Sequence, residues 1–227
     1  MKGLWTSLLH SRAIWIIVAI NICVFVATLL GLSSDTLVTR FDLGYTLTHP
    51  WTLLTSIFVH ESLTHLLINM AILLPFGAIF CQQFSQKAFV WVFLLGGLAG
   101  ALSFAFASVF EAGSMVAEGT LAGSSAAVVA VIVALMYKFS KSFGIILLAV
   151  FASGIVGPNP GGTIAHIAGV FVGIISASIL CRRLALQHER QSKSFRDPLI
   201  IKAEESGFAS LTDEERASLF SSKSNAK

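Results

Sequence analysis

Charged side chains are scarce in this 227-residue chain. Asp, Glu, Lys and Arg make up only 12% of the residues, whereas 55% are hydrophobic and the mean hydropathy is +0.81. An ordinary soluble domain carries about 25% charged residues. The shortage of charge therefore excludes that class and indicates a chain that lies largely within a lipid bilayer.

The charges are also missing from long continuous stretches. Five ranges contain none: 13–34, 66–86, 88–110, 119–137 and 142–181. A helix that spans a bilayer needs about 20 mostly apolar residues, and the last range is long enough for two spans. The glycines and prolines of 157–162 interrupt it, because no regular helix continues through such a segment.

The sequence therefore predicts an all-α membrane protein with six transmembrane helices. Helices are expected because hydrocarbon tolerates no unpaired backbone groups. Their expected ranges are 12–32, 61–82, 86–109, 124–138, 142–157 and 163–182. The fourth helix is short for a full span if it begins at Ser124.

The few basic residues fall mainly in alternate loops. The loops of the opposite side contain only one base, Arg40, together with several acids. Because Lys and Arg concentrate on the cytoplasmic side, both termini are predicted to be cytoplasmic. The net charge of +3 is then a consequence of topology, and no nucleic-acid partner is expected.

Cysteine is nearly absent and predicts no disulfide framework or metal site. Cys23, Cys81 and Cys181 lie in or near the expected helices and share no motif, so they are interpreted as small apolar fillers. The first apolar run is too long for a secretory signal and no small-x-small cleavage site follows it, so it is expected to remain as a membrane anchor.

The stretch HESLTH resembles a zinc-binding helix with one residue too many. Histidines four residues apart lie about 40° apart around a helix and can bind one ion, but His60 and His65 are five apart, or about 140°. A zinc site is therefore disfavoured, although it stays open if His60 precedes the helix. No metal is predicted.

A better-matched pair is His65 and Asn69, four residues apart on one helix face. An imidazole and a carboxamide that point the same way can both donate to one oxygen, as an oxyanion requires. The alternative is that both side chains form hydrogen bonds between membrane helices. The pair alone favours neither interpretation.

The segment TLAGSSAAVV opens the expected fourth helix. Gly123 is followed by Ser124 and Ser125, which would lie at the positive end of the helix dipole beside free backbone N–H groups. Small neighbours leave room for a peptide carbonyl to approach. The alternative is that one serine only caps the helix.

The segment AHIAGVFVG in the sixth helix places a histidine beside a GxxxG step. His166, Gly169 and Gly173 fall within about 60° of one another, so a neighbouring helix can approach His166 closely. A hydrogen bond within the core is the alternative role for this histidine. Glu61, the first residue of the second expected span, is the one carboxylate within the six ranges, and Glu118 is the acid nearest in sequence to the serines, so a Ser–His dyad is favoured over a triad.

These motifs, in this order, resemble the rhomboid intramembrane serine proteases. The resemblance extends over about residues 10–182 and rests on HESLTHLLIN, on GSSA at 123–126, on AHIAGVFVG and on the PWTLLTSIFVH segment before the second helix. It implies a six-helix bundle in which the short fourth helix begins at the nucleophile. It also implies an enzyme without a cofactor, in the lipid bilayer of the plasma (inner) membrane of a prokaryote.

The resemblance assigns roles by position. Ser125 would be the nucleophile, with Gly123 and Ser124 before it, and His166 would be the base. His65, Asn69 and the Ser125 N–H would form the oxyanion hole, and His60 would support the site. Gly169 and Gly173 would allow close helix contact. The expected substrates are other transmembrane proteins, which the enzyme would cut in or beside their membrane helices.

Three positions depart from the family pattern. Val129 stands where a tyrosine often stacks on the histidine, Ala126 replaces a common glycine, and Thr52 replaces an arginine after Trp51. The alternative function is therefore that of a weak or inactive rhomboid-like protein that binds membrane-protein clients. A transporter or channel is disfavoured, because the chain has no intramembrane carboxylates and no inverted repeat.

The expected domain organisation has three parts: a cytoplasmic N-terminus at 1–11, the membrane domain at 12–183 and a cytoplasmic tail at 184–227. The tail is charged and rich in serine. Within it, Thr212 and Glu215 form a capping-box pattern that predicts a short helix. The alternative is a mobile, solvated segment.

Overall fold

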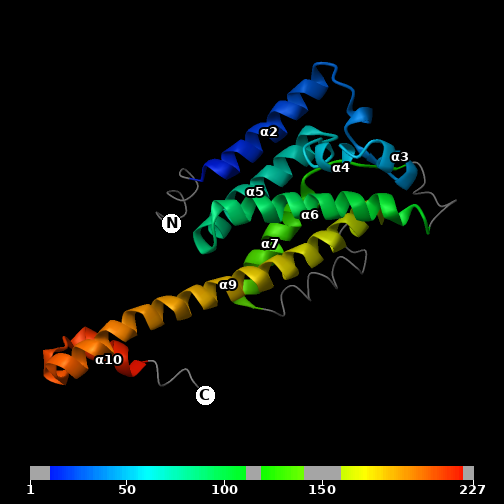
Figure 1. Cartoon of the computed structure of the whole chain (residues 1–227). Helices are drawn as coiled ribbons and strands as arrows, with labels where there is room; N and C mark the ends of the chain where they lie inside the picture. The colour runs from blue at the N-terminus through cyan, green and yellow to red at the C-terminus, as the bar shows by residue number, and fades with distance from the viewer. Residues whose placement is uncertain (1–10, 111–118, 141–159, 222–227) are drawn as a thin grey trace. The chain divides into compact units, whose positions relative to one another are not determined.

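The computed structural model describes residues 11–110, 119–140 and 160–221 (Figure 1). The expected fifth helix at 142–157 and Glu118 lie outside these residues. The long helices are α2 (Arg12–Leu29), α5 (Leu63–Gln83), α6 (Gln86–Ala107) and α9 (Pro160–Ser206), and α7 (Ser125–Phe139) is shorter. Their starts agree with the sequence-based ranges to within three residues.

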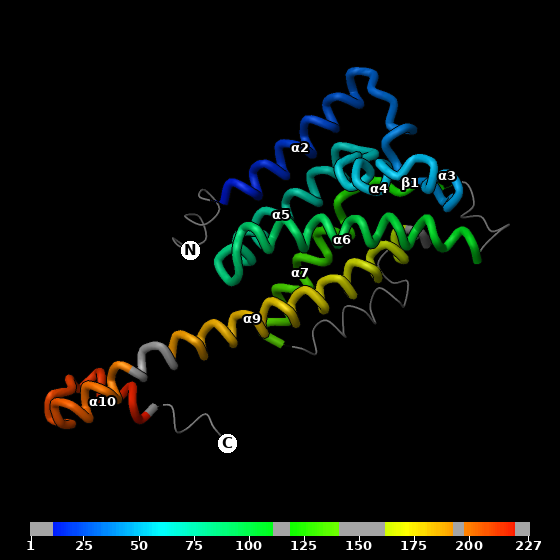
Figure 2. The backbone as a smooth tube through the Cα atoms, in the orientation of Figure 1, coloured from blue at the N-terminus to red at the C-terminus, as the bar shows by residue number. Residues whose placement is uncertain are grey.

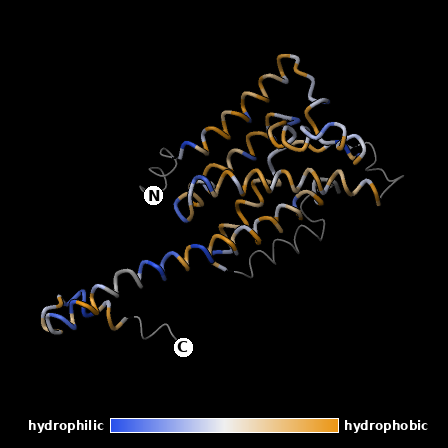
Figure 3. Tube along the Cα trace, viewed as in Figure 1, coloured by the Kyte–Doolittle hydropathy of each residue, from blue (hydrophilic) through white to orange (hydrophobic). Residues whose placement is uncertain are grey.

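Four helices of the described part are long and apolar enough to cross a membrane: α2, α5, α6 and the segment Gly162–Ser192 of α9. The apolar helix α7 has only 15 residues. Figure 3 shows hydrophobic residues along most of α2, α5 and α6, as expected for helices surrounded by lipid and by other apolar helices. The chain is an integral membrane protein with several membrane passes.

Helix α6 contacts α2, α5 and α7, and glycines allow the closest approach. A Cβ atom at Gly96 would collide with Ala130 of α7, and one at Gly100 would lie 2.7 Å from Ala126 Cβ. Small residues at such contacts let membrane helices pack backbone against backbone. This packing fixes the position of α7, where the serines lie.

A small polar substructure precedes α5, and the sequence did not predict its elements. It comprises the 3₁₀ turn Ser34–Thr36, β1 (Thr39–Arg40), α3 (Leu43–Thr48) and α4 (Thr52–Thr55). Strand β1 pairs antiparallel with β2 (Thr120–Leu121), with Thr39 opposite Leu121 (Figure 2). Strand β2 leads directly into α7, so this pairing holds the approach to the serines.

Threonine and serine hydroxyls join this substructure together. The buried Thr39 hydroxyl donates to the Thr52 carbonyl oxygen at 3.0 Å and lies 3.1 Å from Ser56 Oγ. Thr55 donates to the Leu37 carbonyl at 2.6 Å. Because each bond connects segments at least 13 residues apart, they fix the fold of a stretch that has little apolar core of its own.

Helix α9 continues well past residue 182, where the sequence-based range ended. The apolar run stops at Arg182, but the residues that follow are mostly good helix formers and include no glycine until Gly207. Hydropathy therefore marked the end of the apolar span rather than the end of the helix. The proposed domain boundary at 183 stays a prediction.

Residues 179–227 form a second compact unit, separate from the unit formed by residues 1–178. Gly207, with φ of 80°, allows the chain to turn after α9, and α10 (Asp213–Ser221) follows. The expected capping box is present: Thr212 N donates to Glu215 Oε2 at 2.7 Å, and Glu215 N donates to Thr212 Oγ1 at 3.2 Å. Lys202 Nζ pairs with Glu215 at 2.9 Å.

Candidate functional site

Gly123, Ser124 and Ser125 lie where β2 passes into α7. Gly123 has φ of 118°, a conformation that L side chains rarely adopt, and its N–H donates to the Ser56 carbonyl at 2.9 Å. Ser124 occupies the N-cap position of α7 but forms no side-chain cap bond, and Ser125 is the first helical residue. The simple capping role that the sequence left open does not describe either hydroxyl.

His166 lies opposite Ser125, near the start of α9. Its Nε2 atom is 2.9 Å from Ser125 Oγ. Two glycines bring the helices together: a Cβ atom at Gly169 would collide with the Ala126 carbonyl oxygen, and one at Gly173 would lie 2.8 Å from the Ala130 carbonyl oxygen. This hydrogen-bonded hydroxyl and imidazole can exchange a proton without further movement.

His65 lies in the first turn of α5, and its ring packs against Gly123. Ser62 caps this helix by accepting from the His65 N–H at 3.1 Å. A Cβ atom at Gly123 would lie 2.7 Å from His65 Cε1 and 3.0 Å from Nε2. The glycine therefore leaves the space that the imidazole occupies beside the turn formed by Gly123, Ser124 and Ser125.

Asn69 follows His65 by one turn and is buried, with 5% of its surface exposed. Its Nδ2 atom donates one hydrogen bond to the His65 carbonyl oxygen at 3.0 Å. A carboxamide nitrogen carries two N–H groups. The bond to His65 uses one of them, and the other can serve a ligand.

His60 lies just before α5, with 3% of its surface exposed. Its Nδ1 is 3.3 Å from the Phe58 carbonyl oxygen, and its Nε2 is 3.3 Å from Ser124 Oγ. Burial, with a smaller contribution from nearby His65, lowers the pKa of His60 from 6.5 to about 4. A neutral ring has one N–H, and only a donor satisfies the Phe58 carbonyl, so Nε2 accepts from the Ser124 hydroxyl.

The six polar side chains thus form one group. The rings of His60 and His65 meet edge to face with centroids 5.1 Å apart. His60 contacts Ser124, His65 covers Gly123, and His166 contacts Ser125. Segments separated by up to 106 residues in sequence supply this group, and the helix packing described above brings them together.

The three departures from the rhomboid pattern have structural counterparts. Val129 packs in an apolar cluster with Val133 and Val170, next to Ile167 and Ile174. Ala126 is 4% exposed and fills the contact with α6 and α9. Thr52 is fully buried and donates to the His49 carbonyl at 2.8 Å. The structure therefore has aliphatic contacts at Val129 and Ala126 and a hydroxyl hydrogen bond at Thr52.

Sequence reasoning missed the backbone hydrogen bond that holds the turn containing Gly123, Ser124 and Ser125. The Ser56 carbonyl accepts from Gly123 N–H, and the Ser56 hydroxyl joins Thr39. In the sequence, the only indication of this hydrogen bond was the group of hydroxyl residues Thr52, Thr55 and Ser56. They lie in a segment that is too short for a membrane span and mixes polar with apolar residues.

This chain has a helical membrane domain in which a serine and a histidine meet at the start of a helix. It therefore belongs to the class of multi-pass membrane proteins that hold a polar site between their helices. The Rhomboid domain family model matches residues 47–183. The chain therefore belongs to the rhomboid family, whose members are generally intramembrane serine proteases. A comparison with curated proteins finds no match.

Proposed function

We propose that this protein is an intramembrane serine endopeptidase that cleaves transmembrane-helix substrates near the outer membrane surface. The observation that carries the proposal is the 2.9 Å contact between His166 Nε2 and Ser125 Oγ, in a chain of the rhomboid family. A hydroxyl becomes a useful nucleophile only when an adjacent base accepts its proton. Both serines lie beside a histidine nitrogen, but Ser124 is fully buried and 3.3 Å from His60, whereas Ser125 is partly exposed, so a substrate can reach only Ser125.

In the proposed reaction, Ser125 Oγ attacks the scissile carbonyl carbon while His166 Nε2 accepts its proton. The tetrahedral intermediate collapses, the C–N bond breaks, and His166 delivers the proton to the departing amine. Water then attacks the acyl-enzyme by the reverse sequence, again with His166 as base, and releases the acid product and Ser125.

His65, Asn69 and the Ser125 N–H would stabilise the oxyanion. The support for this role is that the His65 ring lies against Gly123 and that Asn69 retains one N–H beyond its bond to His65. The Ser125 N–H lies in the first turn of α7, where backbone donors have no helical partner. One such donor typically contributes about 3 kcal/mol to transition-state stabilisation.

His60 and Ser124 would support the site rather than react. The hydrogen bond from Ser124 to His60 ties the residue before the nucleophile to the segment before α5. The bond therefore orients the Ser125 backbone N–H relative to His65, and Gly169 and Gly173 hold α9 against α7.

The proposal includes the six-helix topology and its orientation. The short helix α7 beginning at Ser125 supports a fourth helix that starts at the nucleophile below the membrane surface. Both termini would be cytoplasmic and the membrane would be the plasma (inner) membrane of a prokaryote. An alternative without catalysis, client binding, is favoured only by Val129, which places no aromatic ring beside His166.

The test is cleavage of a fluorescent single-span substrate by the full-length protein purified in detergent. Ser125→Ala and His166→Ala are each expected to lower kcat/KM by about 10³-fold or more, while Ser124→Ala, the matched neighbour, retains most activity. Wild-type activity is expected to persist with a chelator. Loss of activity on chelation would favour a metal enzyme, and absence of wild-type cleavage across several substrates would favour client binding.

A further inference from the structure

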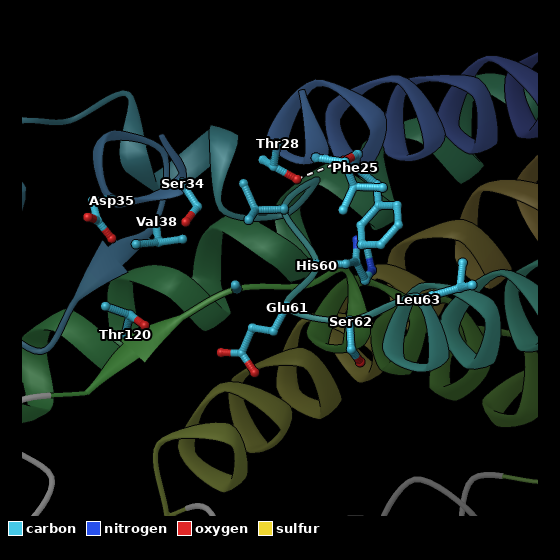
Figure 4. Close-up of a pocket in the computed structure, with 13 residues that line it drawn as sticks. Phe25, Thr28, Ser34, Asp35, Val38, His60, Glu61, Ser62, Leu63 and Thr120 are labelled. Atoms are coloured by element: carbon cyan, nitrogen blue, oxygen red, sulfur yellow. Dashed lines mark hydrogen bonds between the residues drawn. The ribbon is translucent and has the colours of Figure 1, made fainter. Parts of the chain in front are cut away.

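A cavity of about 490 Å³ opens beside the site, with walls from four parts of the chain. The end of α2 contributes Phe25 and Leu29, and the following turn contributes Asp35. The segment before α5 contributes His60 and Glu61. Figure 4 shows Asp35 and Glu61 on these separate segments.

The fourth wall connects this cavity to the nucleophile. Thr120 and Ala122 line it, and Ala122 precedes Ser125 by three residues. In the wall formed by the segment before α5, Ser62 also lines the cavity, and this residue caps the helix that carries His65. A peptide whose carbonyl reaches Ser125 therefore has nearby side chains within reach of the cavity, because adjacent residues of an extended chain are about 3.3 Å apart.

The cavity is acidic and lacks a compensating base. Asp35 and Glu61 are both exposed, and within the described residues neither forms a hydrogen bond or an ion pair with the protein. Among the described residues that line the cavity, none is Lys or Arg. Arg40, the only Lys or Arg between residues 13 and 86, places its guanidinium 4.3 Å from the centre of the Tyr45 ring.

The histidine in the wall does not offset this charge. His60 is buried and hydrogen-bonded to Phe58 and Ser124, and its pKa of about 4 keeps it neutral near pH 7. The cavity lining therefore carries two negative charges, one on each of two segments. The rest of its lining combines apolar side chains, among them Phe25, Val59 and Leu63, with the hydroxyls of Thr28, Ser34, Ser62 and Thr120.

A cavity whose lining combines apolar side chains with two carboxylates matches a long basic side chain. Lys and Arg bury their methylene stems along apolar surface and keep the charged head near polar groups. A purely apolar side chain would leave the carboxylates without a partner, and an acidic one would be repelled. Specificity arises from this difference between the competing side chains.

We propose that this cavity is a specificity subsite that receives a Lys or Arg side chain of the substrate near the scissile bond, paired with Glu61 and Asp35. This inference rests on the proposed function, because it makes the peptide cut at Ser125 the occupant. It assigns Glu61 and Asp35 as specificity-determining residues with no part in the bond-breaking step.

The experiment uses single-span substrates that differ at one position. Each of the residues flanking the cleavage site is changed in turn to Lys, Gln or Glu, and kcat/KM is measured for the full-length protein in detergent at low and high salt. At one of these positions, the wild-type kcat/KM for the Lys substrate is expected to exceed that for the Gln substrate by about five- to tenfold, a difference that partly exposed ion pairs allow. High salt is expected to reduce this ratio.

Variants test whether the two carboxylates produce the preference. In Asp35→Asn/Glu61→Gln, the ratio of Lys to Gln substrate is expected to fall below about twofold, and Glu61→Lys is expected to favour the Glu substrate. The matched control is Asp42→Asn, because Asp42 lies in the same outer segment but does not line the cavity. It is expected to keep the wild-type ratio.

A binding measurement separates this inference from the proposed function. The same substrates are titrated against the Ser125→Ala protein, where affinity does not depend on catalysis. If the Gln substrate binds more weakly than the Lys substrate, and the double substitution abolishes this difference in affinity, the subsite is supported even if the wild type cleaves nothing. Equal affinity for Lys and Gln at every position, or a preference that survives the double substitution, overturns the subsite even if the wild type is an active protease.

Discussion

Gly123 meets two steric requirements at one position. Its φ of 118° belongs to glycine, and its missing Cβ leaves the space that the His65 ring occupies. Gly31 shares the first property, with φ of 105°, but has nothing within 4 Å of where a Cβ would be. Substitutions at the two glycines can therefore distinguish the effect of backbone strain alone from the effect of a collision with His65, the proposed oxyanion donor.

Gly123→Ala is expected to lower kcat by about 10²-fold, because the added methyl displaces His65 from the oxyanion position. Gly31→Ala has the same kind of backbone strain, of order 1 kcal/mol, and is expected to change melting temperature with little effect on kcat. Steady-state kinetics and thermal unfolding of both variants check this. A kcat loss as large in Gly31→Ala as in Gly123→Ala would contradict the steric argument.

His60 gives a pH dependence to stability. Its folded pKa of about 4 lies below its ordinary value of 6.5, so protonation favours the unfolded state. The contribution is fully present above pH 6.5 and is lost as pH falls from 6.5 to about 4, by at most about 3 kcal/mol.

The check is the melting temperature of the detergent-solubilised protein as a function of pH. Wild type is expected to lose stability below pH 6.5, and His60→Gln is expected to show a shallower decline over the same window. His188→Gln, which removes an exposed histidine of α9, is expected to follow the wild type. Parallel pH curves for wild type and His60→Gln would contradict the assignment to His60.

At the scale of elements, the sequence predicted the long helices well. Absence of charge marked α2, α5, α6 and the apolar part of α9, because a span must exclude ionised groups over its whole length. It also predicted a short helix at the serines, and α7 begins at Ser125. Local composition alone decides these features.

The elements that precede α5 could not be predicted in the same way. Strands β1 and β2 have two residues each and are separated by the 79 residues 41–119. No periodic pattern in the sequence therefore indicates that they pair. The Gly123 N–H and the Ser56 carbonyl meet for the same reason, through tertiary folding. The site residues were proposed from their chemistry and family resemblance, whereas their backbone anchors required the fold.

At the scale of the whole molecule, the chain consists of two separate compact units. The second has its own small set of contacts: Leu199 and Leu211 are buried, and Arg216 donates to the Ala209 carbonyl at 3.0 Å. The hydrogen-bonded ion pair with Lys202 lowers the pKa of the partly buried Glu215 carboxyl. These contacts are internal to the unit.

Removal of residues 207–227 is therefore expected to leave kcat/KM within about twofold of the full chain, because the deleted residues contribute no group to the proposed site. The same deletion is expected to remove the Lys202–Glu215 pair and to increase amide exchange over 198–206, whose partner helix α10 is lost. Kinetics and hydrogen exchange of the two forms measure both effects. A loss of more than about tenfold in kcat/KM, with the melting temperature unchanged, would show that the second unit acts on catalysis and is more than an independent appendage of the membrane unit.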